Sequence, residues 1–339
     1  MAVIGVLTAG GDCPGLNAVI RAVVTRAQER HGAEVVGILN GWEGLMQGDT
    51  RLLERSDVRG IQVRGGTIIG TSRMDPYVHG DGPAAVLQTL ARTGIESLIV
   101  IGGDGTLATA LRLAGEGVPV IGVPKTIDND IAATDFTFGF DTAVQIVTDA
   151  IDRLTTTAEA HNRVILVEVM GRTKGWIATY AGMAAGAEAI LIPEIPFDLD
   201  EVARIIRGRH RRGKNYSIVV VAEGIEPPVK TESAKDAFGF DRLGGVAYQL
   251  APVIEELTGF ETRVTVLGHL QRGGTPTAFD RVLGTRFGSR AADLAVEGAS
   301  GVMVALRGAA IVAVPLEEAC SGIRGVDEDL FDVARTFFG

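Results

Sequence analysis

Short apolar runs recur along the chain, and most are followed by a polar or glycine-rich loop. Such runs, with little polar alternation, are typical of parallel strands that are buried on both faces. We interpret as strands residues 2–7, 35–39, 97–101, 118–123, 164–169, 189–192, 216–222, 261–267, 302–306 and 310–314. Because helical patterns separate them, the sequence predicts two Rossmann-like, three-layer α/β lobes with mainly parallel sheets and an active-site cleft between them.

Composition narrows the class of protein. The chain has 339 residues, of which 46% are apolar, so it can form one large domain or, as we expect, two. A net charge of −10 argues against a nucleic-acid partner. Only Cys13 and Cys320 are present, which excludes a disulfide framework. Without an apolar run long enough to span a membrane or a signal-peptide pattern, a soluble cytoplasmic protein is expected.

Three of the predicted strands run into polar loops, of which the first two are rich in glycine. The first loop contains Gly10 and Gly11, the second is 102–106, and the third is 124–130. Glycine lets backbone N–H groups approach a phosphate, and a helix N-terminus favours the anion. An ordinary strand-to-helix turn is the alternative for the first loop. Together, the three junctions indicate a phosphate site that carries a metal ion and a base.

Carboxylates follow two of these strands. Asp128 and Asp130 are two residues apart, so in an extended or turn backbone they can face one small volume. Asp104 lies between glycines, where a carboxylate beside bound phosphates suggests a Mg²⁺ ligand. An N-cap for the following helix is the alternative role of Asp104, and both roles can hold at once.

Several other side chains are candidates for ligand contacts. Trp42 beside glycines can stack on a flat ligand, although such a residue more often covers the core. A glycine-flanked strand within 64–73 is expected to deliver Arg73 to its end, where a guanidinium suits phosphate. His269 stands beside Arg272 and glycines after another strand, which favours ligand binding over a purely structural role.

Arg163 and Arg172 flank one predicted strand. At ~3.3 Å per residue they lie roughly 30 Å apart, so one subunit cannot easily use both on one small ligand. A subunit interface would solve this. The basic cluster 209–214 is interpreted as a solvated helix end, with an anionic effector site as the alternative.

These residues together suit phosphoryl transfer to a sugar phosphate. The glycine loops and Asp104 suit a nucleoside triphosphate or pyrophosphate with Mg²⁺. Asp128 is placed to take the proton of an attacking hydroxyl, a role worth ~10²–10⁴-fold in rate. Arg172 can stabilise charge on the phosphoryl group in flight.

The chain resembles the bacterial-type 6-phosphofructokinase family. The resemblance covers residues 3 to about 295 and rests on five motifs in order, which are 10–18, 102–106, 124–130, 168–172 and 268–274. It implies transfer from Mg-ATP to the 1-hydroxyl of fructose 6-phosphate, a reaction of glycolysis. It also implies a donor lobe of 1–139 plus about 271–321, and a fructose 6-phosphate lobe of about 140–270 plus 322–339.

Site residues follow from the same resemblance. Catalytic roles are implied for Asp128 as the base and for Arg172 and Thr126. The implied donor-site residues are Gly11, Trp42, Arg73, Gly103, Gly105, Thr106 and Lys125, with Asp104 as the magnesium carboxylate. The implied acceptor-site residues are Thr126, Asp128, Asp130, Arg163, Met170, Gly171, Arg172, Glu223, Arg263, His269 and Arg272. A homotetramer or homodimer is implied, in which Arg163 and Arg263 come from the neighbouring subunit.

The chain departs from the family pattern in ways that bear on the donor and on regulation. Pyrophosphate-using members carry Lys at the position of Lys125 together with Asp at that of Gly105, whereas here Lys125 is paired with Gly105. An Asp at 105 would intrude on the α-phosphate, so ATP is favoured and pyrophosphate is the alternative. Thr109 replaces a glycine beneath the base, and Thr25 and Thr155 replace effector-site arginines. A non-catalytic sugar-phosphate sensor or regulatory subunit is the third hypothesis.

Overall fold

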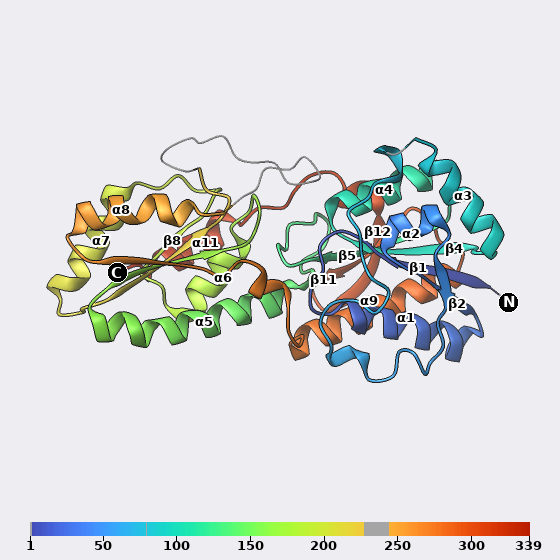
Figure 1. Cartoon of the computed structure of the whole chain (residues 1–339), viewed down its shortest axis with the longest axis horizontal. Helices are drawn as coiled ribbons and strands as arrows, with labels where there is room; N and C mark the ends of the chain where they lie inside the picture. Colours follow the sequence, from blue (N-terminus) through green and yellow to red (C-terminus); the bar gives the residue numbers. More distant parts are fainter. Residues whose placement is uncertain (1, 79, 227–243) are drawn as a thin grey trace. The chain divides into compact units, whose positions relative to one another are not determined.

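The computed structural model describes residues 2–78, 80–226 and 244–339 and divides the chain into two compact units (Figure 1). Unit 1 comprises 1–142 and 272–323, and unit 2 comprises 143–271 and 324–339. The chain therefore passes from one unit to the other three times. The exposed excursion expected at 225–240 lies almost entirely outside the described residues.

Unit 1 is built on an eight-stranded sheet with the order β12-β11-β5-β4-β1-β2-β3, in which β6 also pairs with β5. The pairs within β11-β5-β4-β1-β2 are parallel, and only the two edge pairs, β11–β12 and β2–β3, are antiparallel. The strands are β1 (Val3–Thr8), β2 (Glu34–Ile38), β3 (Thr50–Leu52), β4 (Ser97–Gly102), β5 (Val120–Thr126), β6 (Phe138–Gly139), β11 (Val302–Arg307) and β12 (Ala310–Pro315).

Helices cover both faces of this sheet. Figure 1 shows α1 and α9 on one face and α2, α3 and α4 on the other. The α1–α9 contact is close, because a Cβ added at Gly288 would lie 2.5 Å from the carbonyl oxygen of Val19. The helices are α1 (Leu16–His31), α2 (Gly41–Gln47), η1 (Ile61–Val63), η2 (Pro76–Val78), α3 (Gly82–Thr93), α4 (Asp104–Gly115), α9 (Ala278–Val296) and α10 (Leu316–Ala319).

Unit 2 holds a four-stranded sheet with the order β10-β7-β9-β8, in which every pair is parallel. Its strands are β7 (Val164–Val169), β8 (Ala189–Leu191), β9 (Ser217–Ala222) and β10 (Thr262–Val266). The helices are α5 (Phe140–His161, which begins in unit 1), α6 (Trp176–Ala185), α7 (Leu199–Arg211), α8 (Val246–Thr258), η3 (Gly268–Arg272) and α11 (Glu328–Arg335). The predicted fold class, two mainly parallel α/β sheets with their helices, is confirmed.

The prediction of a strand within residues 64–73 is wrong. This segment has no regular structure beyond the end of η1, because side chains take up its backbone groups. Asn17 donates to the carbonyl oxygens of Arg64 and Gly65 at 3.1 and 3.3 Å and accepts from the N–H of Ile68 at 2.9 Å. The segment is thereby fixed beside the first turn of α1.

Asp280 joins the starts of two helices within unit 1. Its side chain is fully buried and accepts hydrogen bonds from the N–H and hydroxyl of Thr142, at 2.8 and 2.5 Å, near the start of α5. Thr277, the N-cap of α9, donates to Asp141 at 2.6 Å. Burial raises the pKa of Asp280 to about 6, although the bonds from Thr142 oppose this shift.

We predict that Asn17→Ala lowers the free energy of unfolding by about 2–4 kcal/mol, since it leaves several backbone groups of 64–68 without partners. Urea denaturation measures this loss. Asn215→Ala is the control, because Asn215 is exposed and its hydrogen bonds compete with water, so a loss below about 1 kcal/mol is expected there. Equal losses in the two variants would contradict the role given to Asn17.

Asp280 should make stability depend on pH in a defined direction. Its folded-state pKa is above the ordinary value, so the folded state holds the proton more tightly, and stability falls as pH rises from about 4 to 6. Asp280→Asn keeps an acceptor for Thr142 and cannot ionise. The variant should therefore gain stability relative to wild type across that range, by at most about 3 kcal/mol, and the difference should level off above about pH 6. A difference that does not change with pH in paired denaturation curves would show that Asp280 does not titrate in this range.

Candidate active site

Three adjacent strands of unit 1 bring the two glycine-rich loops and the loop with Asp128 and Asp130 to one edge of the sheet. In the order β5-β4-β1, each strand is parallel to the next, so their carboxyl ends lie together. The N–H of Ala9 donates to the carbonyl oxygen of Ile101 at 3.0 Å, which continues the β1–β4 pairing up to the start of the first loop. We call residues 9–15, 102–106 and 124–130 the unit 1 loops.

The glycines of the unit 1 loops differ in the physical reason that favours glycine at each position. Gly10 has φ of 81°, and a Cβ there would lie 3.4 Å from Lys125 Nζ and from Thr106 Oγ1. Gly102 packs against Thr106, because a Cβ would lie 2.2 Å from Thr106 Cγ2. At Gly105, a Cβ would meet nothing within 4 Å, and the residue lies in the first turn of α4. Packing among the described residues therefore does not account for glycine at 105.

The N-terminus of α4 is open to an anion. Gly103 is the N-cap, and no side chain of the described residues caps the helix, so the positive end of the helix dipole is not offset there by a capping side chain. Asp104 is the first helical residue and not the N-cap, which corrects the alternative role that the sequence suggested. Asp104 is exposed at the start of α4, next to Gly105, where the helix dipole favours negative charge.

A magnesium ion fits this chemistry only together with phosphate. Within 2–78, 80–226 and 244–339, no group of three or more His, Cys, Asp or Glu side chains could hold a metal ion. Mg²⁺ typically binds one or two carboxylates, several waters and phosphate oxygens of the substrate. The exposed carboxylate of Asp104 beside an anion-favouring helix end suits that arrangement.

Two cations lie behind the first loop. Lys125 is 4% exposed, and its Nζ donates to the carbonyl oxygen of Gly11. Burial lowers the pKa of Lys125, and the positive charge of Arg272 lowers it further. Arg272 donates to the carbonyl oxygen of Asp12 at 3.3 Å. Between them, Cys13 is fully buried, and burial raises its pKa to about 12, so it is no nucleophile.

The third loop is a turn held by its own side chains. Asp128 donates its N–H to Thr126 Oγ1 at 3.0 Å, and Asn129 accepts from the N–H of Thr137 at 3.0 Å. Asn129 has φ of 51°, so the strict alternation of an extended strand does not apply between Asp128 and Asp130. Thr126, Asp128 and Asp130 are all buried.

Two residues that we expected to contact the donor, Trp42 and Arg73, differ in burial. Trp42 is 2% exposed and belongs to the core cluster with Leu7 and Ile38, so the structure favours the core role over stacking of an exposed ring on a ligand. Arg73 is exposed. The preceding residues bind the first loop, because Thr71 Oγ1 donates to the Gly10 carbonyl at 2.7 Å and Ser72 O accepts from Gly10 N–H at 2.9 Å.

In unit 2, the loops that follow β7, β9 and β10 carry the remaining candidates. β7 lies between β10 and β9, and the three are parallel. The N–H of Arg172 donates to Glu223 Oε1 at 3.1 Å, which joins the loops after β7 and β9. Gly171 and Arg172 both have positive φ, at 141° and 52°. His269 is exposed in η3, which follows β10. We call 170–175, 223–225 and 268–271 the unit 2 loops.

Arg163 and Arg263 lie away from the unit 2 loops. Arg163 comes directly before β7 and Arg172 follows it, so the two stand at opposite ends of that strand, as expected. Arg163 makes two hydrogen bonds to Glu261, at 2.8 and 3.0 Å, and Arg263 also pairs with Glu261. The hydrogen bonds from Arg163 lower the pKa of Glu261.

Gln271 is a residue whose role we did not foresee from the sequence. It is fully buried and uses its amide to join two of the unit 2 loops. Its place inside the motif 268–274 was visible, but a neutral amide carries no charge or metal-binding signal that would single it out. Only the contacts show what it does.

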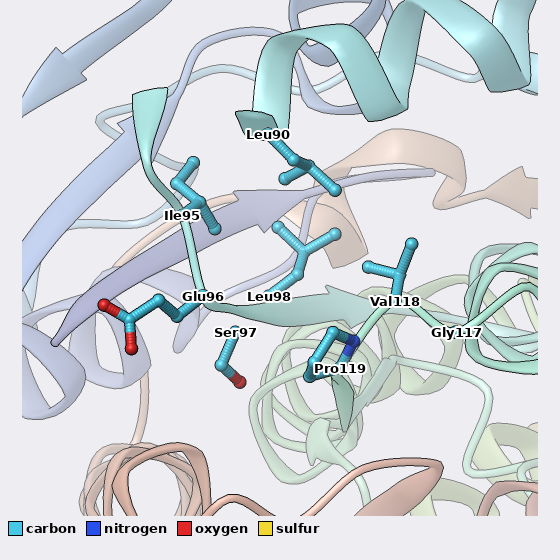
Figure 2. A pocket seen from close by; sticks show the side chains of 8 residues that line it. All are labelled: Leu90, Ile95, Glu96, Ser97, Leu98, Gly117, Val118 and Pro119. Atoms are coloured by element: carbon cyan, nitrogen blue, oxygen red, sulfur yellow. The ribbon is translucent and has the colours of Figure 1, made fainter. Parts of the chain in front are cut away.

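A cavity of about 170 Å³ lies elsewhere in unit 1. Its lining residues are Leu90, Ile95, Glu96, Ser97, Leu98, Gly117, Val118 and Pro119 (Figure 2). These residues stand where β4 and β5 begin, whereas the unit 1 loops stand where these strands end. The cavity is therefore not part of the candidate site.

Comparison of the sequence with known proteins identifies relatives along the whole chain. The family model described as Phosphofructokinase matches residues 3–295. A pyrophosphate–fructose 6-phosphate 1-phosphotransferase of Amycolatopsis methanolica is 54% identical, with 99% of each chain covered. An ATP-dependent 6-phosphofructokinase of Mycobacterium bovis is also 54% identical, again with 99% of each covered.

Solved structures show the same fold. A phosphofructokinase of Pichia pastoris in the T-state has a TM-score of 0.84 and 32% identity, over 99% of this chain and 36% of that longer chain. A pyrophosphate-dependent phosphofructokinase of Nitrosospira multiformis has a TM-score of 0.85 over 99% of this chain and 91% of the other, at 21% identity. The second likeness concerns the fold alone. Among the described residues, no helix is both long and apolar enough to cross a membrane.

Proposed function

Because the chain belongs to the phosphofructokinase family, we propose that it transfers a phosphoryl group from Mg-ATP to the 1-hydroxyl of fructose 6-phosphate. The products are fructose 1,6-bisphosphate and ADP. Relatives at the same 54% identity carry pyrophosphate- and ATP-dependent names, so the choice of donor rests on this chain's own residues. The observation that carries it is the open space at Gly105.

Gly105 supports a nucleoside triphosphate as the donor. Glycine in a helix costs up to ~1 kcal/mol relative to alanine, and here the protein would have room for the methyl group. Space kept open beside Asp104 and the α4 N-terminus suits an α-phosphate, which pyrophosphate lacks. A carboxylate at 105 would both fill that space and repel the phosphate charge.

Lys125 favours pyrophosphate as the alternative donor. A buried lysine at this position matches the pattern of pyrophosphate-using members, and a pyrophosphate-dependent enzyme is among the 54% identical relatives. In this chain, however, Nζ of Lys125 is engaged by the Gly11 carbonyl. The lysine therefore supports the fold of the first loop, which both donors require.

The proposal gives each unit its own residues. In unit 1, Gly11, Arg73, Gly103, Gly105, Thr106 and Lys125 hold the donor, and Asp104 holds Mg²⁺, which when bound neutralises phosphate charge. Asp128 takes the proton of the attacking hydroxyl, with Thr126 bonded to its N–H. Thr126, Asp130 and Arg272 of unit 1 and Met170, Gly171, Arg172, Glu223 and His269 of unit 2 bind the sugar phosphate. Arg172 also stabilises charge on the transferring group.

Under this proposal, Arg163 and Arg263 of one chain bind the sugar phosphate in the site of a second copy of the chain. Glu261 holds both guanidinium groups at a distance from Arg172, along the length of β7. A homotetramer or homodimer in which these arginines reach the acceptor of a neighbouring copy accounts for their place. The non-catalytic sensor remains a third hypothesis, which predicts tight sugar binding without turnover of either donor.

Asp128→Asn tests the base. We expect turnover to fall by about 10²–10⁴-fold while the dissociation constant of fructose 6-phosphate changes less than about threefold, because only proton removal is lost. Steady-state rates and calorimetric titration measure the two. Asp149→Asn, which alters an exposed carboxylate on α5, should leave both unchanged. Near wild-type turnover in Asp128→Asn would remove Asp128 from the role of base.

Substitutions at Gly105 test the donor. Wild type should turn over ATP faster than pyrophosphate, and Gly105→Asp should lose at least about 100-fold in kcat/KM for ATP through steric and charge repulsion. Gly105→Ala separates the effect of volume from that of charge. Gly115→Asp is the control at the far end of the same helix, where a Cβ also meets nothing within 4 Å. Faster turnover of pyrophosphate than ATP by wild type would establish the alternative donor.

A further inference from the structure

The loops after β7 and β10 begin side by side. These two strands are parallel neighbours, with Val266 of β10 opposite Glu168 of β7. The N–H of Leu267 donates to the carbonyl oxygen of Glu168 at 3.1 Å, which continues the pairing to the point where both strands end. Beyond this point Met170–Arg172 has no regular structure and η3 is a short 3-10 helix, so strand pairing has ended. Something other than strand pairing must set the spacing between them.

Gln271 supplies that link. Its side chain is 0% exposed, Oε1 accepts from the N–H of Met170 at 3.2 Å, and Nε2 donates to the carbonyl oxygen of Gly268 at 3.0 Å. The two partners define the orientation of the amide. The N–H of Met170 needs an acceptor, which only the amide oxygen provides, and the Gly268 carbonyl needs a donor, which only the amide nitrogen provides. One side chain therefore fixes the first residue after β7 to the first residue of η3.

The backbone held in this way includes one conformation that is unusual for its residue. Arg172 has φ of 52°, a left-handed value that is uncommon outside glycine, whereas Gly171, with φ of 141°, is of the residue type that adopts positive φ readily. Glu223 holds the loop from the side of β9 through the N–H of Arg172, at 3.1 Å. Gln271 holds it from the side of β10 through the N–H of Met170.

We infer that Gln271 is a positioning residue for the sugar-phosphate half of the site, where it sets the spacing between Met170–Arg172 and the turn that carries His269. This inference rests on the proposed function for its ligand, a phosphorylated sugar. Gln271 itself is buried and touches no ligand. It acts by keeping the backbone of Met170–Gly171 and the exposed His269 at the separation that the sugar phosphate needs.

Gln271→Glu should make sugar-phosphate binding depend on pH, which a purely structural role of Gln271 would not predict. A carboxyl group can accept from Met170 in either protonation state, but it can donate to the Gly268 carbonyl only when protonated. Neither the Met170 N–H nor the Gly268 carbonyl is a cation that would offset the charge of the ionised side chain in this variant, so burial should raise the pKa of the new carboxyl group. The variant should therefore bind the sugar phosphate weakly at high pH and recover as pH falls.

The experiment is calorimetric titration of the full chain with fructose 6-phosphate, without donor, between about pH 6 and pH 8.5. Near pH 8.5 we expect Gln271→Glu to raise the dissociation constant about tenfold or more over wild type, and near pH 6 to lie within about threefold of it. Wild type measured at the same pH corrects for the titration of the ligand itself, and it carries the same charged neighbours, Glu168, Arg172, Glu223 and His269. Steady-state rates should show the change in KM for fructose 6-phosphate and not for the donor.

Two further variants complete the test. Gln145→Glu makes the same charge change at an exposed position on α5 in the same unit and should bind like wild type at every pH. Gln271→Met removes both hydrogen bonds while keeping the length of the side chain, and should weaken binding at every pH, with folding checked by thermal unfolding. A Gln271→Glu ratio that stays constant across pH, or wild-type affinity in Gln271→Met, overturns the inference. Absence of fructose 6-phosphate binding and turnover in wild type would instead overturn the proposed function.

Discussion

Parallel pairing of β1, β4 and β5 is the constraint on which the rest of unit 1 depends. Parallel strands end at a common edge, so the strand pairing alone brings together three loops that are distant in the sequence. Within these loops, positive φ favours glycine at Gly10, and the side chain of Thr106 leaves no room for a Cβ at Gly102. Lys125 and Arg272 then bind the carbonyl oxygens of Gly11 and Asp12 in the first loop.

The same logic holds in unit 2, where β10, β7 and β9 end together. There too, glycine and polar side chains act together, since a Cβ at Gly224 would lie 2.0 Å from the carbonyl oxygen of Arg172. Glu223 and Gln271 each accept a hydrogen bond from a backbone N–H of the loop after β7, in which Arg172 has a left-handed φ of 52°. Both units therefore set their loop geometry by omitting side chains where backbones approach and by hydrogen-bonding backbone groups.

Sequence patterns predicted the strands well because buried parallel strands are continuous in apolar residues, as in 97–101 and 164–169. They failed at 64–73, where glycines and apolar residues resemble a strand but Asn17 takes up the backbone groups. They also did not decide whether Trp42 is core or exposed, because the side of α2 that packs inward depends on tertiary contacts. Charged residues and glycines of the site were visible in the sequence, whereas Gln271 was not, because its importance lies in two hydrogen bonds that only the fold creates.

The order of strands has a consequence for synthesis on the ribosome. β5, which leads into the loop with Asp128, pairs on one side with β11, and β11 begins at Val302. About 176 residues must therefore be made after Thr126 before β11 can pair with Ile121 and Gly122 of β5, although β6 pairs with the end of β5 much earlier. At roughly 5–20 residues per second this takes about ten to thirty-five seconds. During that interval part of an apolar strand edge is open to wrong pairing. The strand order thus makes completion of this sheet wait for the chain that follows most of unit 2.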